Sequence, residues 1–281
     1  MVGMLKCMFI IPKVYQMTTS KLNTDKPMIL LTNDDGFFSE GLEVLARALK
    51  TIAQVYIVAP DREKSATSLA LSLHRPLRVK EVRKNIYAID GTPADCVYMA
   101  VQKLLPRKPD LLISGPNPGP NLGQQDTAYS GTVAGALQGT FLQIPSVALS
   151  ILHDAEKIFH YENATKIALV LIKKILKIPP KEGITLNINI PPPPVRGIKV
   201  VKLGQKRYNP EIIEKIDPRN RTYFWIGTGQ PKAIGEKNSD VKVIEEGYIT
   251  VTPLHTDKTD YTLVDNAGFQ NIFLSLNDEI L

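Results

Sequence analysis

The chain has few cysteines and no long apolar run. Only two cysteines, Cys7 and Cys96, occur among its 281 residues, too few for a disulfide framework or for a zinc site built on paired thiolates. No stretch is long enough to span a bilayer, and the short apolar segment 5–12 lacks the length and the cleavage site of a signal peptide. We therefore expect a cytoplasmic protein with ordinary thiols and no membrane partner.

The sequence also lacks the pattern of a nucleic-acid binder, although its charge invites that reading. Lys and Arg together number 34 against 28 for Asp and Glu, and a basic cluster lies between Arg196 and Arg221. The lysines are scattered, however, and no aromatic residues alternate with them to form a stacking platform. Nucleic acid is not expected as the main partner, whereas a basic surface can attract phosphorylated small molecules.

Buried strands and amphipathic helices alternate along much of the chain. Apolar runs predict strands over 28–31, 54–59, 110–113 and 145–149, and helical patterns such as 41–50 lie between them. This order is typical of an α/β protein with a Rossmann-like three-layer core and a mainly parallel sheet. A chain of this length with 43% hydrophobic residues can bury a large core.

Changes in pattern divide the chain into three predicted regions. Residues 1–26 have no clear period and are expected to form a poorly ordered tail. Residues 27–190 are expected to form the Rossmann-like core, which carries the candidate metal- and phosphate-binding residues described below. Four prolines, 191–194, mark the next boundary. Alternating apolar residues then predict a β-rich oligomerisation region with a long hairpin over 191–281, and the Glu-Gly pair within 241–251 suggests a hairpin turn.

Two adjacent carboxylates follow the first predicted strand. Asp34 and Asp35 lie where the strand alternation has ended and Gly36 permits a turn, so both side chains can converge on one point. Two ionised carboxylates this close repel each other unless one takes a raised pKa or a cation lies between them. We favour a cation; the alternative is that one aspartate caps the turn or helix and the other is solvated.

Polar side chains also follow the next strands, at the sheet edge where parallel sheets bind ligands. Ser65 lies in the loop after the second strand, and a helix cap or a solvated hydroxyl is its alternative role. The segment 114–123, SGPNPGPNLG, is predicted to be neither helix nor strand because it is rich in Gly, Pro and Asn. Its Asn117 and Asn121 offer oxygen ligands or amide donors, and its spacing does not match a nicotinamide-binding GxGxxG motif.

A phosphate cradle is predicted where a helix of small residues begins. Ser130, Gly131 and Thr132 would present free N–H groups and the positive end of the helix dipole, and together with Asn121 they would hold phosphate oxygens. Plain helix capping is the alternative for this segment. Asp95, in the segment GTPAD, is predicted to be structural because it completes a capping box at another helix start.

Four stretches follow one another in unbroken order: TNDDG at 32–36, VAPDREKSA at 58–66, GTPADCV at 91–97, and SGPNPGPNLG with YSGTVAGA within 114–136. Together they resemble the SurE family, the survival-protein phosphatases that act as 5′-nucleotidases. The match covers most of residues 28–149. The resemblance implies a Rossmann-like core, hydrolysis of nucleoside 5′-monophosphates, and homodimers or homotetramers built through the C-terminal part.

The resemblance also implies one divalent cation per subunit, held by Asp34, Asp35, Ser65 and Asn117. Oxygen donors alone select a hard cation, Mg²⁺, Mn²⁺ or Ca²⁺, over zinc. Such an ion would polarise the phosphoryl group and position or deprotonate a water, with Asp34 and Asp35 as the catalytic carboxylates. A route in which one of these aspartates attacks the phosphate is the less favoured alternative.

Two residues leave the mechanism open. Pro118 stands where the family usually has an arginine, so a cationic phosphate contact is missing at this position. No general acid is identifiable beyond His255, for which a structural role is the main alternative. Two other functions also remain open: a non-catalytic nucleotide- or metal-binding stress module, and a phosphatase of broader phosphomonoester or polyphosphate specificity.

Overall fold

The computed structural model describes residues 26–209, 211–227, 229, 232–234 and 236–276. The tail predicted over residues 1–26 therefore lies outside the described residues, except for Lys26. Within the described part, no helix combines the length and the apolar character needed to cross a membrane.

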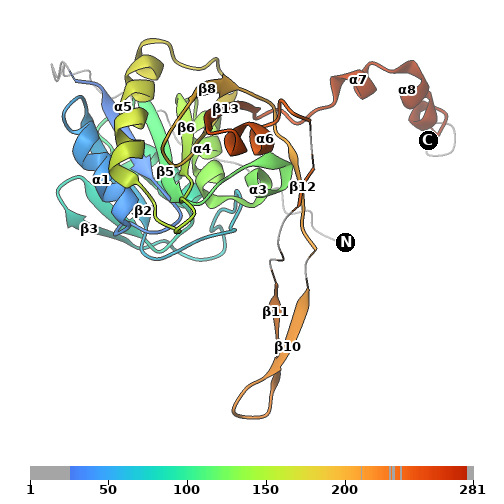
Figure 1. Ribbon diagram of the computed structural model, residues 1–281, viewed down its shortest axis with the longest axis horizontal. Coiled ribbons are helices and arrows are strands. Elements are labelled where there is room, and N and C mark those ends of the chain that lie inside the picture. The colour runs from blue at the N-terminus through green and yellow to red at the C-terminus, as the bar shows by residue number, and fades with distance from the viewer. Residues whose placement is uncertain (1–25, 210, 228, 230–231, 235, 277–281) are drawn as a thin grey trace, which may run out of the picture.

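A nine-stranded sheet with the order β3-β4-β2-β1-β5-β6-β7-β13-β8 forms the centre of the molecule (Figure 1). Its strands pair in parallel except at β3–β4 and β7–β13. The predicted α/β class with a mainly parallel sheet is therefore confirmed. The strand bounds are β1 (Met28–Thr32), β2 (Gln54–Pro60), β3 (Val79–Arg83), β4 (Ile86–Ile89), β5 (Leu111–Pro118), β6 (Ser146–Ile151), β7 (Ile184–Ile190), β8 (Gly197–Val200) and β13 (Tyr248–His255).

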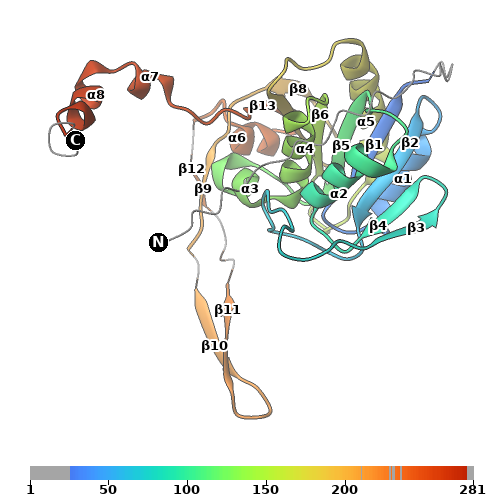
Figure 2. The same cartoon turned by 180° about the vertical axis from the view of Figure 1, so that it is seen from behind.

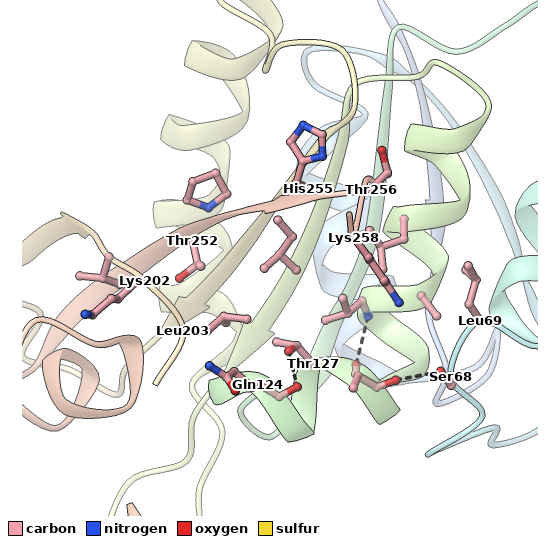
Figure 3. Close-up of a pocket in the computed structure, with 18 of the residues that line it drawn as sticks. Ser68, Leu69, Gln124, Thr127, Lys202, Leu203, Thr252, His255, Thr256 and Lys258 are labelled. Carbon is pink, nitrogen blue, oxygen red and sulfur yellow. Dashed lines mark hydrogen bonds between the residues drawn. The ribbon is translucent and has the colours of Figure 1, made fainter. Parts of the chain in front are cut away.

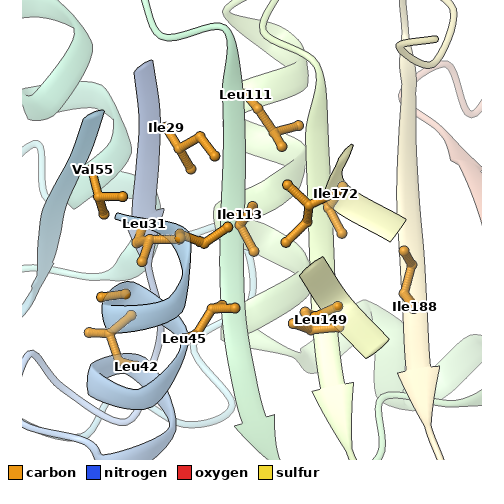
Figure 4. Packing of buried hydrophobic residues seen from close by; sticks show 14 of the residues in the cluster. Ile29, Leu31, Leu42, Leu45, Val55, Leu111, Ile113, Leu149, Ile172 and Ile188 are labelled. Atoms are coloured by element: carbon orange, nitrogen blue, oxygen red, sulfur yellow. The ribbon is translucent and has the colours of Figure 1, made fainter. Parts of the chain in front are cut away.

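Helices cover both faces of this sheet and complete the three layers. On one face lie α1 (Glu40–Leu49) and α5 (Tyr161–Lys177); on the other lie α2 (Pro93–Met99), which continues as a π-helical turn, and α4 (Gly131–Phe141). Strand alternation sends side chains of β1 into both layers, which explains why β1 is a continuous apolar run. Figure 4 shows one of these two apolar layers between β1, β5, β6 and the helices.

The C-terminal part divides between the sheet and two projecting arms. Strands β8 and β13 lie in the main sheet, so residues beyond the predicted boundary at 190 contribute to it. The first arm is an antiparallel ribbon and the second carries two helices, and both stand away from the body in Figures 1 and 2. Their elements are β9 (Gln205–Arg207), β10 (Ile212–Ile216), β11 (Thr222–Ile226), β12 (Lys232–Ile234), α7 (Tyr261–Val264) and α8 (Ala267–Leu274).

Two local predictions were wrong. The hairpin predicted over 241–251 is instead the helix α6 (Asp240–Glu245) followed by β13. Gly247, at φ +82°, ends this helix, and its N–H donates to the Ile244 carbonyl at 3.0 Å. A glycine that ends a helix and one in a hairpin turn look alike in the sequence, which explains the wrong prediction. The long hairpin lies elsewhere, in the pair β10–β11.

The glycine- and proline-rich segment 114–123 is also not a loop throughout. Its first five residues extend β5 to Pro118, and a register shift between Ser114 and Asn117 absorbs the irregular sequence. Gly115, at φ +119°, lies in this irregularity, and an added Cβ there would overlap the Leu149 carbonyl. A short helix, α3 (Gly123–Tyr129), begins at the last residue of the segment.

Candidate metal and phosphate site

The turn after β1 is held by the side chain of Asn33. Its Nδ2 donates to the Gly36 carbonyl at 3.0 Å and to the Ser39 hydroxyl at 2.7 Å, while its Oδ1 accepts from the Gly36 N–H at 3.2 Å. Gly36 has φ +104°, a conformation that favours glycine. This network fixes the backbone that carries the two aspartates at the carboxyl edge of the sheet.

Asp34 lies against the first turn of α4. It is 4% exposed, and its Oδ1 accepts a hydrogen bond from the Thr132 hydroxyl. Burial raises the pKa of Asp34, and the hydroxyl and N–H groups of Thr132 act in the opposite direction. Gly131 permits this contact, because an added Cβ would lie 2.8 Å from the Cβ of Asp34. The predicted cradle residue Thr132 is thus already bonded to a carboxylate of the protein.

Ser130 caps α4, as its predicted position at a helix start requires. Its hydroxyl oxygen accepts from the Val133 N–H at 3.0 Å. The capping box predicted around Asp95 is likewise confirmed, with the Thr92 side chain and Asp95 as its two members.

Asp35 carries the clearest sign of a missing partner. Its Oδ2 is buried and has no hydrogen-bond partner within the described residues. Burial, followed by the charges of Asp34 and Glu63, raises the pKa of Asp35 to about 7. A buried carboxylate oxygen without a donor is costly, and a cation between the two carboxylates would both relieve the repulsion and give this oxygen a partner. The donor chemistry of this pair therefore fits a hard divalent ion.

Ser65 comes close to the pair through the backbone of its neighbour. The Lys64 N–H donates to the Asp34 carbonyl at 2.6 Å, which ties the loop after β2 to the turn after β1. The Ser65 hydroxyl donates to Glu63 Oε1 at 2.8 Å. Ser65 is exposed, so solvent and small ligands can reach its side chain.

Asn117 follows the strand next to β1. Thr32 pairs with Ser114 in the parallel β1–β5 register, so Asn117 and the aspartates extend beyond the same edge of the sheet. The Asn117 Nδ2 donates to the Gly119 carbonyl at 2.8 Å, a bond that uses the amide nitrogen and leaves the oxygen for another partner.

Asn121 is held in place by groups of β6 and β7. Its Nδ2 donates to the Ser150 hydroxyl at 2.8 Å, and its N–H and carbonyl bond to the side chains of Asn187 and Asn189. It is 7% exposed. These contacts use its side-chain amide to position the loop before α3, and no contact given for it reaches the aspartates.

Neither His255 nor a large cavity beside α4 includes the aspartate pair. β13 runs antiparallel to β7, so His255, opposite Ile184, lies at the other edge of the sheet and is not placed to act as a general acid there. The cavity, about 1080 Å³, lies between α3, α4, β13 and the chain after β8 (Figure 3). Ser130 lines it, whereas Asp34 and Asp35 do not. In the described part of the chain, no group of three or more His, Cys, Asp or Glu side chains could hold a metal, so a metal at the aspartate pair would also need neutral oxygen ligands.

Comparisons with known proteins match the chain to one family. The family model of the survival protein SurE matches residues 29–210. The chain belongs to the SurE family. Proteins named 5′-nucleotidase SurE are similar over most of its length: that of Syntrophotalea carbinolica is 42% identical over 234 residues, covering 83% of this chain and 93% of its own. That of Myxococcus xanthus is 43% identical over 252 residues, covering 88% and 95%.

A solved SurE structure also superposes on most of the chain. The SurE protein of Aquifex aeolicus matches with a TM-score of 0.74 and 38% identity, covering 87% of this chain and 100% of that one. The match extends beyond the segments that carry the motifs, into the C-terminal part of the chain. The resemblance to the SurE family drawn from the motifs is therefore confirmed.

Sequence reasoning missed two residues that the structure places around the aspartate pair. Asn33 stands three positions before Gly36, and an asparagine shortly before a glycine is a turn signal that could have identified it. Glu63 contributes charge beside both aspartates. It lies within the stretch VAPDREKSA, but its residue type alone assigned it no role, because a glutamate in a polar loop is ordinary.

Proposed function

We propose that the chain is a divalent-metal-dependent phosphatase that hydrolyses nucleoside 5′-monophosphates to nucleoside and phosphate. The similar proteins are named 5′-nucleotidases and align over more than four fifths of the chain. The observation that supports this most directly is the buried, unpartnered oxygen of Asp35 beside Asp34, at the edge where α4 also begins. This combination offers a cation site next to a helix N-terminus, which suits a phosphate ester.

We assign the ion, Mg²⁺, Mn²⁺ or Ca²⁺, to the oxygens of Asp34, Asp35, Ser65 and Asn117. When bound, such an ion polarises a phosphoryl group and lowers the pKa of a water. The hydroxyl and N–H groups of Thr132 favour the charged form of Asp34 against the effect of burial on its pKa, and they fix the orientation of the carboxylate.

Phosphate oxygens would be held by the remaining polar groups at the start of α4. Because Thr132 is bonded to Asp34, the Ser130 hydroxyl and the Gly131 N–H are the better candidates. Asn121 would act by holding the preceding loop in position. The exposed Pro118 at the end of β5 offers no charge to the phosphate.

The test is release of phosphate from AMP and GMP by the purified chain. Chelation should remove the activity and added Mg²⁺ or Mn²⁺ should restore it. Asp34→Asn should abolish turnover with the fold retained, while Glu43→Gln, an exposed change on α1, should leave turnover unchanged. Full activity in the chelated enzyme or in Asp34→Asn would refute the proposal. Nucleotide binding without turnover would favour the stress-module alternative. Turnover of polyphosphate or simple phosphomonoesters in a substrate panel would favour the phosphatase of broader specificity.

We further propose that the chain forms a homo-oligomer through its two arms. A two-stranded ribbon such as β10–β11 is marginal in water, yet Phe224 and Trp225 are 62% and 63% exposed on it. Helix α8 exposes Ile272 and Phe273 in the same way, at 61% and 57%. Such surfaces are typical of interfaces.

The apolar flank of α4, which lines the cavity of Figure 3, is a surface of matching character for helix α8 of a second copy. Light scattering after size exclusion tests this assembly. Ile272→Asp with Phe273→Asp should lower the measured mass to that of one chain. Lys173→Asp, an exposed change on α5, should leave the mass unchanged.

A further inference from the structure

Glu63 stands directly beside the metal site without a role in the function proposed above. Its Oε1 accepts the hydrogen bond of the Ser65 hydroxyl at 2.8 Å. Glu63 is exposed, and the described contacts give its carboxylate no ion pair of its own with Lys or Arg. The only side chain bonded to this carboxylate in the described part of the chain is thus a residue that we assign as a metal ligand.

The backbone around Ser65 is already fixed with respect to the aspartates. The Lys64 N–H holds the Asp34 carbonyl at 2.6 Å, and the Thr67 hydroxyl donates to the Lys64 carbonyl at 2.9 Å. The remaining freedom of the Ser65 side chain is the rotation about χ1 and of the hydroxyl proton. An acceptor for that proton therefore decides where the oxygen lone pairs point.

A neutral serine ligand needs such an acceptor. A hydroxyl has one proton and two lone pairs, so it can bind a cation through its oxygen only while its proton is directed elsewhere. The cation makes the proton more acidic and strengthens its hydrogen bond to a carboxylate. Outer groups that orient metal ligands in this way typically change metal affinity by about 10- to 100-fold.

We propose that Glu63 is a positioning residue of the metal site: it accepts the proton of the Ser65 hydroxyl and so directs the oxygen of that hydroxyl toward the ion at Asp34 and Asp35. This inference rests on the proposed metal site. The effect of Glu63 on metal affinity should therefore depend on the presence of Ser65. It should also depend more on an acceptor oxygen at position 63 than on a negative charge there, since an exposed charge is strongly screened.

The experiment is a calorimetric titration of Mn²⁺ into the full-length, metal-free chain. We expect Glu63→Ala to weaken the affinity about tenfold. Glu63→Gln keeps an acceptor oxygen and should recover most of that loss. The double variant Glu63→Ala with Ser65→Ala should bind no more weakly than Ser65→Ala alone. Asp61→Asn is the matched control, because it removes a negative charge from the same loop. The carboxylate of Asp61 bonds to Arg62 and not to Ser65.

The outcomes separate this inference from the function on which it rests. No saturable Mn²⁺ binding by the unaltered chain, or binding that Asp35→Asn does not reduce, would overturn the metal site and this inference together. Normal binding by the unaltered chain with no loss in Glu63→Ala would overturn the role of Glu63 alone. A loss in Glu63→Gln equal to that in Glu63→Ala, or a loss that persists without Ser65, would also overturn it.

Discussion

A single methyl group at Gly131 tests whether Asp34 must occupy its observed position. In Gly131→Ala the new Cβ would lie 2.8 Å from the Cβ of Asp34 and 2.9 Å from its Oδ2. An ordinary carbon–carbon contact is at roughly 3.4 Å, so the aspartate must retreat by about 0.6 Å. Asp34 is buried and bonded to Thr132, and it cannot move without disturbing that bond.

The expected effects on stability and on catalysis differ in size. Overpacking of this kind costs about 1 to 3 kcal/mol, and the better helix propensity of alanine offsets up to about 1 kcal/mol of it. The chain should therefore stay folded, with a melting temperature lower by a few degrees. A misplacement of about 1 Å in an active site costs about 100-fold, so a shift of this size should lower kcat/KM for AMP by about 10- to 100-fold.

The same helix supplies the control. Gly139 lies two turns further along α4 than Gly131, away from Asp34. In Gly139→Ala the added Cβ would lie 2.8 Å from Leu112 Cδ1 and would also meet the Ser146 hydroxyl. This variant should lose a similar amount of stability and keep its kcat/KM. Phosphate release and thermal unfolding should be measured on both variants. Unchanged kcat/KM in Gly131→Ala, or an equal loss in both, would refute the reasoning.

Three further predictions concern groups around the site and its support. Thr132→Val removes a donor from the buried Asp34 and should lower both metal affinity and phosphate release, measured by titration and turnover. Metal-free chain should lose stability as pH rises from about 4 to 8, because the pKa of Asp35 is 3.8 unfolded and about 7 folded, so the folded state binds more protons between these values. Thermal melts should show this fall, and Mg²⁺ or Asp35→Asn should diminish it. Asp240→Ala leaves three backbone N–H groups without an acceptor and should cost at least about 3 kcal/mol in denaturant unfolding, with Asp240→Asn milder.

The sequence allowed the site-bearing half of the fold to be predicted because local and tertiary signals agree there. Strand β1 is apolar on both faces and lies buried between two helical layers, so its sequence pattern and its observed burial both indicate a central strand. The capping boxes and caps at Thr92 and Ser130 are likewise written in consecutive residues. These elements and the parallel crossover between them were enough to predict that the site residues lie at the carboxyl edge of the sheet.

What could not be predicted depends on contacts between distant residues. The continuation of β5 through Gly115 requires pairing with β6, which no local pattern shows. The bond of Thr132 to Asp34 joins residues 98 positions apart, and the same helix start had been read as a free phosphate cradle. Helix α6 was read as strand because its apolar residues are too few to distinguish a period of 2 from one of 3.6.

The base of the ribbon arm is tied to the body by a shielded polar cluster. Asp126 on α3 accepts from the Lys206 ammonium and from the Tyr208 hydroxyl, and the side chains of Lys206 and Asp126 are only 10% and 14% exposed. Burial and this bond raise the pKa of Tyr208. A shielded ion pair with a further donor is much stronger than one on the open surface. Strand β9 at the base of the arm is therefore held against α3, and an association through this base would need less ordering than one through a free chain.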